Sequence, residues 1–485
     1  MKTFAAMALS ALVWSAGPPA GVEDDPLGRA LAALDTASVA ADLAFLADPE
    51  LGGRGTATPE AEVAALYVES RVRHLGLAPG STDGYRPRFP LARRGISAEE
   101  SLTRLVVDGE IVPLALGRDT FLRGSVDTVD VDASGPVVAV GIGDKRSLER
   151  AGDLAGSWAL LADRGRGTLR AITRSMEAGA LGVLLTPAAD YTRDSYAERY
   201  AASTAEALEG RLSSPLSSPP GGPGGPPVLL LTRDATARIA ASLEIGIESL
   251  LEPGTRPQVH MTERRVVEQA EITSPNVAAL LRGKDPRRSD ELIVLCAHLD
   301  HLGRRRGELY PGADDNASGS VGLLALADAI VERGAYDRSI LFLWVTGEEA
   351  GLWGSAAWCA DPRLPAGLAP VAAFNLDMIG RDAPETLWWT PTSRHSEHNA
   401  LAALVPDLAP SEGFSDLVSQ DSYWSASDHY SFANALRIPV VYLSSGEHDD
   451  YHEPTDTADR IDLDKLLRVV RLHLRLFEAA EGVDL

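Results

Sequence analysis

The feature that most constrains the fold is an alternation of apolar strands and helical segments between residues 274 and 485. Strands are expected in ELIVLCA, SILFLWVT, VAAFNLDMI and IPVVYLSS, and helices in ASGSVGLLALADAIVERG, EEAGLWGSAAWCA and KLLRVVRLHLRLFEAAE. Apolar runs separated by helices are typical of a mostly parallel sheet that helices cover on both faces. The sequence therefore predicts an α/β domain whose ligands bind at the carboxyl ends of the strands.

Two regions of different texture precede this domain. Residues 26–76 place apolar residues at helical spacing in two blocks, and Thr58-Pro59-Glu60 supplies an N-cap followed by a first-position proline. From about residue 100, short β-rich runs alternate with turn signals, which predicts a compact β-rich module with one or two helices. Within it, the proline- and glycine-rich residues 215–227 predict a surface loop. A chain of 485 residues also favours two domains, at ~100–200 residues each.

The first sixteen residues, MKTFAAMALSALVWSA, have the pattern of an export signal. Lys2 precedes an uncharged stretch that is shorter than the about 20 apolar residues of a membrane-spanning helix. We therefore expect residues 1–20 to be a signal peptide, which predicts a periplasmic or secreted protein with no stable membrane insertion after cleavage. The two cysteines, Cys296 and Cys359, are expected to be buried free thiols, with a single disulfide as the alternative.

Charge and composition exclude two classes of protein. The formal net charge of -24 and a pI near 4.8 argue against a nucleic-acid partner, because phosphate binding needs clustered lysine and arginine. Hydrophobic residues make up 45% of the chain, which excludes an intrinsically disordered protein. Short basic islands near residue 164 and at 304–306 are interpreted as solvated loops.

Five side chains able to bind a metal stand at the ends of the predicted strands or in the loops after them: His298, Asp314, Glu349, Asp377 and His452. Two imidazoles and three carboxylates are too many for one tetrahedral zinc ion. They fit two ions that share a bridging carboxylate and a water. We predict that Asp314 is the bridge, that His298 and Asp377 bind one ion, and that Glu349 and His452 bind the other.

Three further carboxylates are predicted to serve this centre. Glu348 is adjacent to a predicted ligand, so its side chain diverges toward the bridging water as general base. Asp300 is expected to accept the ring N–H of His298, as carboxylates next to metal-bound histidines do. Asp456 would support the second histidine, His452, in the same way. Asp315, beside the predicted bridge, is expected to support the following turn.

These segments carry a resemblance to a known family. HLDHLG, GADDNASG, TGEEAGLWGS, NLDMIG and YHEPTDT resemble, in order and spacing, the ligand motifs of the M28 family of zinc aminopeptidases. The resemblance covers residues 36 to about 95 and 262 to 485. The module between them resembles a protease-associated (PA) domain in the pieces GPVVAVGI, LAGSWALLADRG and AGALGVLL.

The resemblance implies a three-layer α/β/α phosphorylase/hydrolase-like catalytic domain formed by residues 26–100 and 262–485, with a PA-like domain inserted at 101–261. It implies a metallo-aminopeptidase that hydrolyses N-terminal residues from peptides and proteins. The expected cofactors are two Zn²⁺ ions, with Co²⁺ or Mn²⁺ as alternatives. Asp428, in SASDHYSF, lies in a stretch similar to a family motif near the substrate pocket, and is expected to support a ligand or face the substrate.

Three other interpretations stay open at this point. A glutaminyl cyclase resembles the same fold but uses one zinc ion, and the presence of both His298 and Asp377 argues against it. A glutamate-type carboxypeptidase shares the five ligands and needs an arginine for the substrate carboxylate, for which Arg381 and Arg394 are candidates. A non-catalytic binding protein on this fold would lack a ligand, and none of the five is missing.

The remaining candidates have simpler explanations. His301 is expected to be structural, and His395 and His398 to lie on the surface without a third ligand. Aromatic residues that could line an apolar substrate pocket are more often core residues; they are Trp388, Trp389, Phe414, Tyr423 and Trp424. No GxSxG occurs in the sequence, which removes the commonest serine-hydrolase signal.

Overall fold

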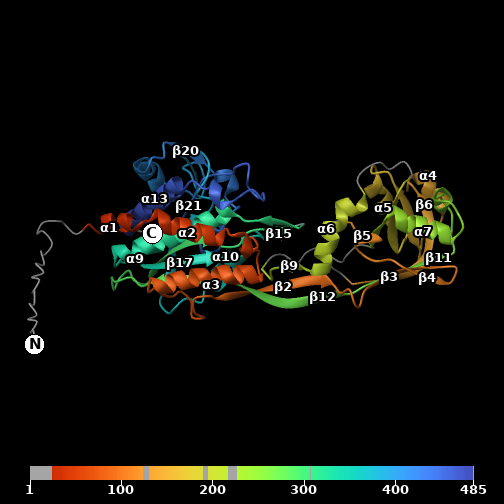
Figure 1. Ribbon diagram of the computed structural model, residues 1–485, viewed down its shortest axis with the longest axis horizontal. Helices are drawn as coiled ribbons and strands as arrows, with labels where there is room; N and C mark the ends of the chain where they lie inside the picture. The colour runs from red at the N-terminus through yellow and green to blue at the C-terminus, as the bar shows by residue number, and fades with distance from the viewer. Residues whose placement is uncertain (1–24, 124–129, 189–194, 217–226, 306, 484–485) are drawn as a thin grey trace, which may run out of the picture.

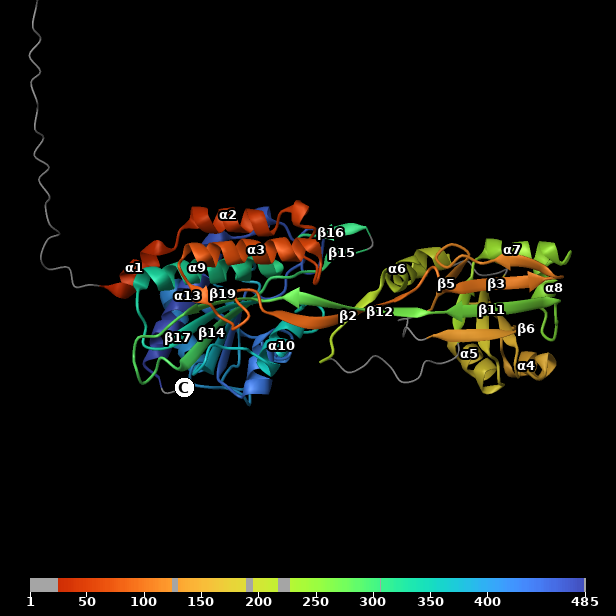
Figure 2. The same ribbon diagram turned by 90° about the horizontal axis from the view of Figure 1, so that it is seen from below.

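The computed structural model describes residues 25–483 except 124–129, 189–194, 217–226 and 306. These residues form two lobes joined by a ribbon of two long antiparallel strands (Figures 1 and 2). The predicted signal peptide, residues 1–20, lies outside the described part. Among the helices that are described, none combines the length and apolarity needed to cross a bilayer.

The larger lobe is built on a mostly parallel sheet, as the apolar runs predict. Its four central strands, β17, β14, β18 and β21, pair in parallel, and antiparallel strands extend it on both sides. In sheet order the strands are β1 (Ala78–Pro79), β13 (Val277–Leu281), β17 (Ser339–Val345), β14 (Glu291–His298), β18 (Ala369–Leu376), β21 (Val440–Ser444), β19 (Thr386–Thr390) and β20 (Asp416–Ser419).

Helices cover both faces of this sheet, so the lobe has three layers. Alternate residues of β14 face opposite sides, because side chains alternate along a strand. Ile293 and Leu295 join the large core cluster, whereas Val294 and Cys296 join a smaller one. The helices over the large cluster are α1 (Pro26–Ala33), α2 (Thr36–Leu46), α3 (Pro59–His74), α9 (Gly319–Arg333) and α13 (Leu463–Glu481). Over the smaller cluster lie α10 (Trp353–Ala360) and the π-helical turn Phe432–Leu436, which follows α12 (His429–Ser431).

Local sequence explains where these helices begin. Thr58 accepts a hydrogen bond from the backbone nitrogen of Ala61 and precedes Pro59, which is the N-cap that the sequence predicts for α3. Asp462 caps α13 in the same way through the nitrogen of Lys465. The cysteines of this lobe are both buried and free, as predicted.

The smaller lobe contains a second eight-stranded sheet in which β6, β7, β8 and β10 run parallel. In sheet order its strands are β4 (Glu110–Pro113), β3 (Leu102–Val107), β11 (Val259–Arg265), β6 (Val131–Gly141), β7 (Trp158–Asp163), β8 (Gly182–Pro187), β10 (Val228–Leu231) and β5 (Thr120–Leu122). Parallel strands need crossover connections. The expectation of one or two helices is therefore wrong, since the described residues of this lobe form α4 (Lys145–Ala151), α5 (Thr168–Glu177), α6 (Tyr196–Glu209), α7 (Arg233–Ser242) and α8 (Ile247–Leu250).

The ribbon between the lobes consists of β2 (Arg88–Ile96) and β12 (Val267–Pro275), paired along their whole length. A short strand of the smaller lobe, β9 (Arg211–Ser213), adds to the edge of β2 and returns toward the larger lobe. A hairpin of the larger lobe, formed by β15 (Gly303–Arg305) and β16 (Glu308–Tyr310), projects toward the smaller lobe (Figure 2). The remaining helix, α11 (Val405–Leu408), packs beside α13.

Candidate metal centre

The carboxyl ends of the central parallel strands bring the chemically active side chains of the larger lobe together. His298 is the last residue of β14, Asp377 follows β18, and Glu348 and Glu349 follow β17. His452 reaches the same edge from the loop after β21. Ligands of open α/β sheets bind at this edge.

One cluster of donor atoms lies around His298. Its Nε2 atom is 3.2 Å from Oδ1 of Asp377 and 3.4 Å from Oδ1 of Asp315, and all three side chains are buried. Ser427 Oγ donates to the other oxygen of Asp377 at 2.7 Å, and thereby fixes the carboxylate. These three donor atoms are close enough to bind one ion.

A second cluster shares Asp315 with the first. Nε2 of His452 lies 3.2 Å from Oδ2 of Asp315 and 3.2 Å from Oε2 of Glu349. Nδ1 of His301 lies 2.6 Å from Oε1 of Glu349 and 3.6 Å from Oδ2 of Asp315. The two oxygens of Asp315 thus face different clusters, which is the arrangement of a bridging carboxylate.

The structure does not bring Asp314, the predicted bridge, into either donor cluster. Oδ1 of Asp314 accepts a hydrogen bond from the backbone of Gly380 at 2.7 Å, and Oδ2 lies 3.3 Å from Nε2 of His448. The π-helical turn Ala313–Ser318 leaves helical geometry at Asp315, where φ is -103° and ψ is 94°. Neighbouring side chains of this turn point in different directions, and spacing alone does not reveal which one faces the histidines.

Asp456 supports that turn and not His452, which corrects its predicted role. Its carboxylate accepts hydrogen bonds from the backbone nitrogens of Asp314 at 3.0 Å and Asp315 at 3.1 Å. Burial opposes the charged form of Asp315, but His301 and His298 beside it hold the pKa of that carboxyl well below its usual range.

Asp300 also acts differently from the prediction. Nδ1 of His298 contacts the backbone carbonyl of Asp300 at 3.1 Å, whereas the nearer carboxylate oxygen is 3.9 Å away. The carboxylate instead accepts from Thr56 Oγ1 at 2.6 Å and from the backbone nitrogen of Glu348 at 3.2 Å. Asp300 therefore orients the ring through its main chain, and the loop that carries Glu348 through its side chain.

Glu348 faces the first cluster, with Oε2 4.0 Å from Nε2 of His298. Burial raises the pKa of its carboxyl well above the usual value, and the neighbouring Asp428 and Asp377 raise it further, although His298 opposes them. Asp428 itself is fully buried, and burial raises its pKa to about 7. It is not among the residues that line the neighbouring pocket, which contains Glu348.

The donor set fits zinc. Imidazole nitrogens and carboxylate oxygens are zinc ligands, and two clusters around one carboxylate correspond to two ions that share a bridge. Buried polar atoms normally have hydrogen-bond partners. Nδ1 of His301 and Oε1 of Glu349 are buried and have none among the described residues, so that a cation between them would satisfy both.

Comparison with known proteins places a peptidase family match over the residues that form the donor clusters. Residues 276–477 match the family description "Peptidase family M28". The match covers the segment that carries the candidate metal centre. A probable leucine aminopeptidase of Arthroderma otae is 30% identical over 208 residues, which are 41% of this chain and 55% of that protein. Leucine aminopeptidase 1 of the same organism is 41% identical over 207 residues, or 39% and 54% of the two chains. The chain thus spans about half the length of the curated relatives it matches.

Solved structures share the fold of this chain over most of its length. An aminopeptidase from Aneurinibacillus sp. strain AM-1 has a TM-score of 0.53 at 21% identity, with 94% of this chain and 96% of that chain covered. BSAP, a zinc aminopeptidase from Bacillus subtilis, has a TM-score of 0.50 at 19% identity, with 92% and 95% covered. At this identity the likeness establishes the fold alone, and it agrees with the predicted α/β architecture.

Arg54 supports the candidate metal centre, and the sequence interpretation did not include it. Its guanidinium is fully buried and donates to the carbonyl oxygens of Leu299 at 2.9 Å, Pro311 at 2.7 Å and Gly312 at 2.8 Å, and also to Leu46. Burial lowers its pKa to about 10, and nearby carboxylates led by Asp456 oppose that shift. An arginine within an apolar N-terminal segment, LGGRGT, was the available signal.

Two cavities adjoin the candidate metal centre. A narrow one of 50 Å³ contains Glu348, with an aromatic and thioether lining that includes Met378, Tyr423, Tyr442 and Tyr451. Of the aromatic candidates, Tyr423 lines this cavity, whereas Trp389 and Phe414 belong to the large core. The other cavity, of 340 Å³, is lined by His301 and Glu349, the arginines of the β15–β16 hairpin, and Leu212 from the inserted lobe.

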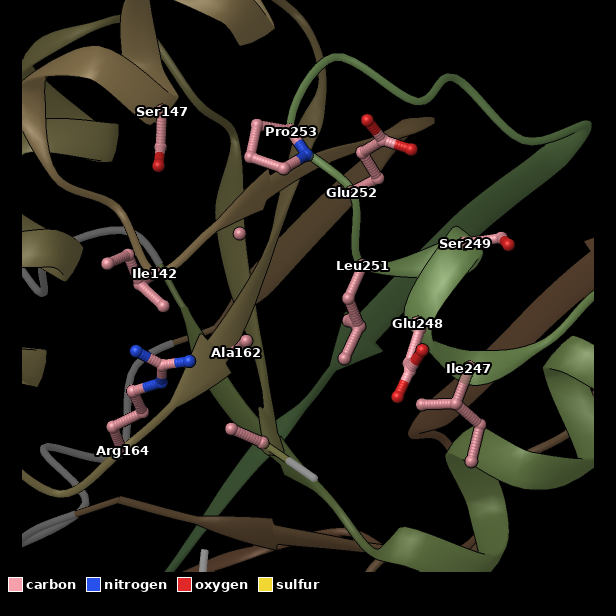
Figure 3. A pocket seen from close by; sticks show the side chains of 12 residues that line it. Ile142, Ser147, Ala162, Arg164, Ile247, Glu248, Ser249, Leu251, Glu252 and Pro253 are labelled. Carbon is pink, nitrogen blue, oxygen red and sulfur yellow. The ribbon is translucent and has the colours of Figure 1, made fainter. Parts of the chain in front are cut away.

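A third cavity lies in the smaller lobe, at the carboxyl ends of β6, β7 and β8 (Figure 3). It has a volume of 700 Å³ and is lined mainly by apolar side chains, with Arg164 on one side and Glu248 and Glu252 on the other. None of the predicted metal ligands is among the residues that line it.

Proposed function

We propose that this chain is a metallo-aminopeptidase that hydrolyses N-terminal residues from peptides and proteins with two Zn²⁺ ions. The observation that carries the proposal is Asp315, whose two oxygens face two separate clusters of zinc-ligand side chains. The proposed ligands are His298, Asp315 and Asp377 for one ion, and Asp315, Glu349 and His452 for the other. The names of the curated relatives, both leucine aminopeptidases, support the activity.

Glu348 is the proposed general base. When bound, the ions would supply Lewis-acid chemistry that lowers the pKa of water and polarises the peptide carbonyl. Glu348 then accepts the proton of the attacking water and donates it to the leaving amine. Asp300 holds the Glu348 backbone through a hydrogen bond, so the carboxylate keeps its direction toward the centre. The raised pKa of the Glu348 carboxyl suits a group that must both take up and release a proton.

The narrow cavity beside Glu348 is the proposed site of the substrate's N-terminal side chain. Its lining by Met378, Tyr423 and Tyr451 favours an apolar residue. Glu447 is exposed and lines the cavity. Its negative charge and those of the surrounding carboxylates attract a protonated α-amine. No arginine occurs among the described residues that line this cavity, which argues against a carboxypeptidase that recognises a terminal carboxylate.

Two further assignments complete the proposal. Residues 1–20 would direct the protein to the periplasm or the outside of the cell and then be removed. Residues 101–261, between the two ribbon strands, would form the PA-like domain, for which the position of Leu212 beside the candidate centre suggests control of access. Peptide N-termini are the proposed partners, and the acidic charge disfavours nucleic acid.

A substrate panel tests this function. We expect release of p-nitroaniline from leucine, methionine and alanine p-nitroanilides, no release from their N-acetylated forms, and complete loss after chelation that zinc restores. About two zinc equivalents per chain should be bound. Cleavage of the acetylated substrates, or cyclisation of an N-terminal glutamine peptide with one bound zinc, would contradict the proposal and support the other family activities.

A further inference from the structure

The two donor clusters are unequal. The cluster around His298 contains three protein side chains, His298, Asp315 and Asp377. The other contains His301, Asp315 and Glu349, and Nε2 of His452 lies 3.2 Å from Asp315 and from Glu349. The two donor clusters therefore differ by one buried imidazole, that of His301.

The contact of His301 with Glu349 is not an ordinary hydrogen bond. Nδ1 of His301 and Oε1 of Glu349 are 2.6 Å apart, yet neither atom has a hydrogen-bond partner among the described residues. Two buried electron-rich atoms at this distance repel each other unless a proton or a metal cation lies between them. Oδ2 of Asp315 completes the same group of donors.

The fold holds this imidazole in a fitted slot. The backbone nitrogen of His301 donates to the carbonyl of Arg54 at 3.3 Å, and the residue pairs with Gly55 across a β-bridge. The ring lies against Gly312, where a Cβ atom would stand only 2.3 Å from Cγ of His301. Gly312 also has a φ of 61°, which favours glycine. The absence of a side chain at position 312 thus leaves room for the imidazole.

We propose that His301 is a fourth protein ligand of the second ion, an inference that rests on the proposed two-zinc centre. His301, Asp315, Glu349 and His452 would complete the four ligands of a closed zinc site. The first site has three protein ligands and keeps an open position for water or substrate. The second ion is therefore bound tightly and exchanges slowly, whereas the first is the exchangeable one.

The wild-type protein by itself tests this inequality. In a zinc titration against a competing chelator, we expect two binding steps of one equivalent each. Their Kd values should differ by at least on the order of 10–100-fold, because loss of a group that only supports a metal ligand already changes metal affinity by that much. The variant D377N should weaken the weaker step and leave the tighter one in place. Two steps of equal affinity in the wild type would overturn the inference.

The variant H301Q then assigns the tight site. We expect its tight step to weaken by at least ~10-fold, with the weaker step kept. H260Q, which changes an exposed histidine of the smaller lobe, serves as the control and should bind as the wild type does. With one Co²⁺ ion bound, the visible absorption of H301Q should differ from that of the wild type, because a nitrogen ligand is lost. Unchanged affinity and an unchanged cobalt spectrum would overturn the proposal.

Two outcomes separate this inference from the function on which it rests. A wild-type protein that binds no zinc and cleaves no aminoacyl substrate would refute the proposed function. A wild-type protein that binds two zinc ions and is active, with H301Q identical in both affinities, would refute the role of His301 alone. Circular dichroism of the metal-free variants confirms that H301Q is folded before the affinities are compared.

Discussion

The carboxylate of Asp456 accepts a hydrogen bond from the backbone nitrogen of Asp315 at 3.1 Å, across 141 positions of sequence. Through this bond and those to Asp314, a buried side chain near the end of the chain fixes the turn after β16. The turn then directs Asp315 toward the histidines and Asp314 toward Gly380. The choice between two adjacent aspartates is made by a residue distant in sequence.

The pair of variants D315N and D314N tests that choice. D315N should lose most of the bound zinc and at least ~100-fold in kcat/KM, because it removes a ligand shared by both ions. D314N should retain both zinc equivalents and lose on the order of 1–2 kcal/mol of stability from its weakened bond to Gly380. Zinc content and chemical denaturation measure both effects, and the opposite ranking of the two variants would return the bridge to Asp314.

Replacement of the proposed base should separate chemistry from metal binding. E348Q keeps the size of the side chain but removes its ability to accept a proton, so kcat should fall by about 10²–10⁴-fold while both zinc equivalents remain. The exposed Glu397 gives a matched control, and E397Q should have wild-type rates. Wild-type turnover by E348Q would show that another group takes the proton.

Arg54 should couple stability to metal binding. R54M removes the donor to four backbone carbonyls on three segments, and leaving buried acceptors unpaired costs roughly 3 kcal/mol or more. Zinc affinity should fall as well, since two of those segments carry His301 and Asp315. The exposed Arg282 provides a control, and R282M should change stability by less than about 0.5 kcal/mol. A destabilised R54M with wild-type zinc affinity would limit Arg54 to a role in folding.

Lys465 should make stability depend on alkaline pH. Burial lowers its pKa from 10.5 to about 8, opposed by nearby carboxylates led by Asp382. Between these values the unfolded chain binds more protons than the folded one, so stability rises as pH increases from about 8 to about 10.5. The metal-free wild type should therefore gain stability relative to K465M over this range in urea denaturation. Parallel pH profiles for the two proteins would show that the lysine is not perturbed.

The inserted lobe should control access by long substrates. Ile96 and Val267 are paired at the outer end of the ribbon, so residues 97–266 can be replaced by a two-residue Asn-Gly turn. This deletion also removes Leu212 from the cavity beside His301 and Glu349. Activity on dipeptides should be retained, whereas the rate ratio between a folded protein substrate and a dipeptide should change. Equal losses on both substrates would exclude a filter.

The sequence by itself determined the architecture of the larger lobe and most of its active edge. Apolar runs separated by helices led to the parallel sheet, because strands buried on both faces must be apolar throughout. His298, Glu349, Asp377 and His452 were predicted as ligands because each stands at the end of an apolar strand or in the loop after it. Such features depend on local sequence, so they can be predicted without knowledge of the tertiary contacts.

Tertiary structure decided the finer chemistry. Whether Asp314 or Asp315 faces the histidines depends on the bond to Asp456, and whether His301 joins them depends on the space left by Gly312. Arg54 acts through carbonyls on segments far from it in sequence. These outcomes rest on the directions of side chains within turns and on long-range hydrogen bonds, which residue spacing does not encode.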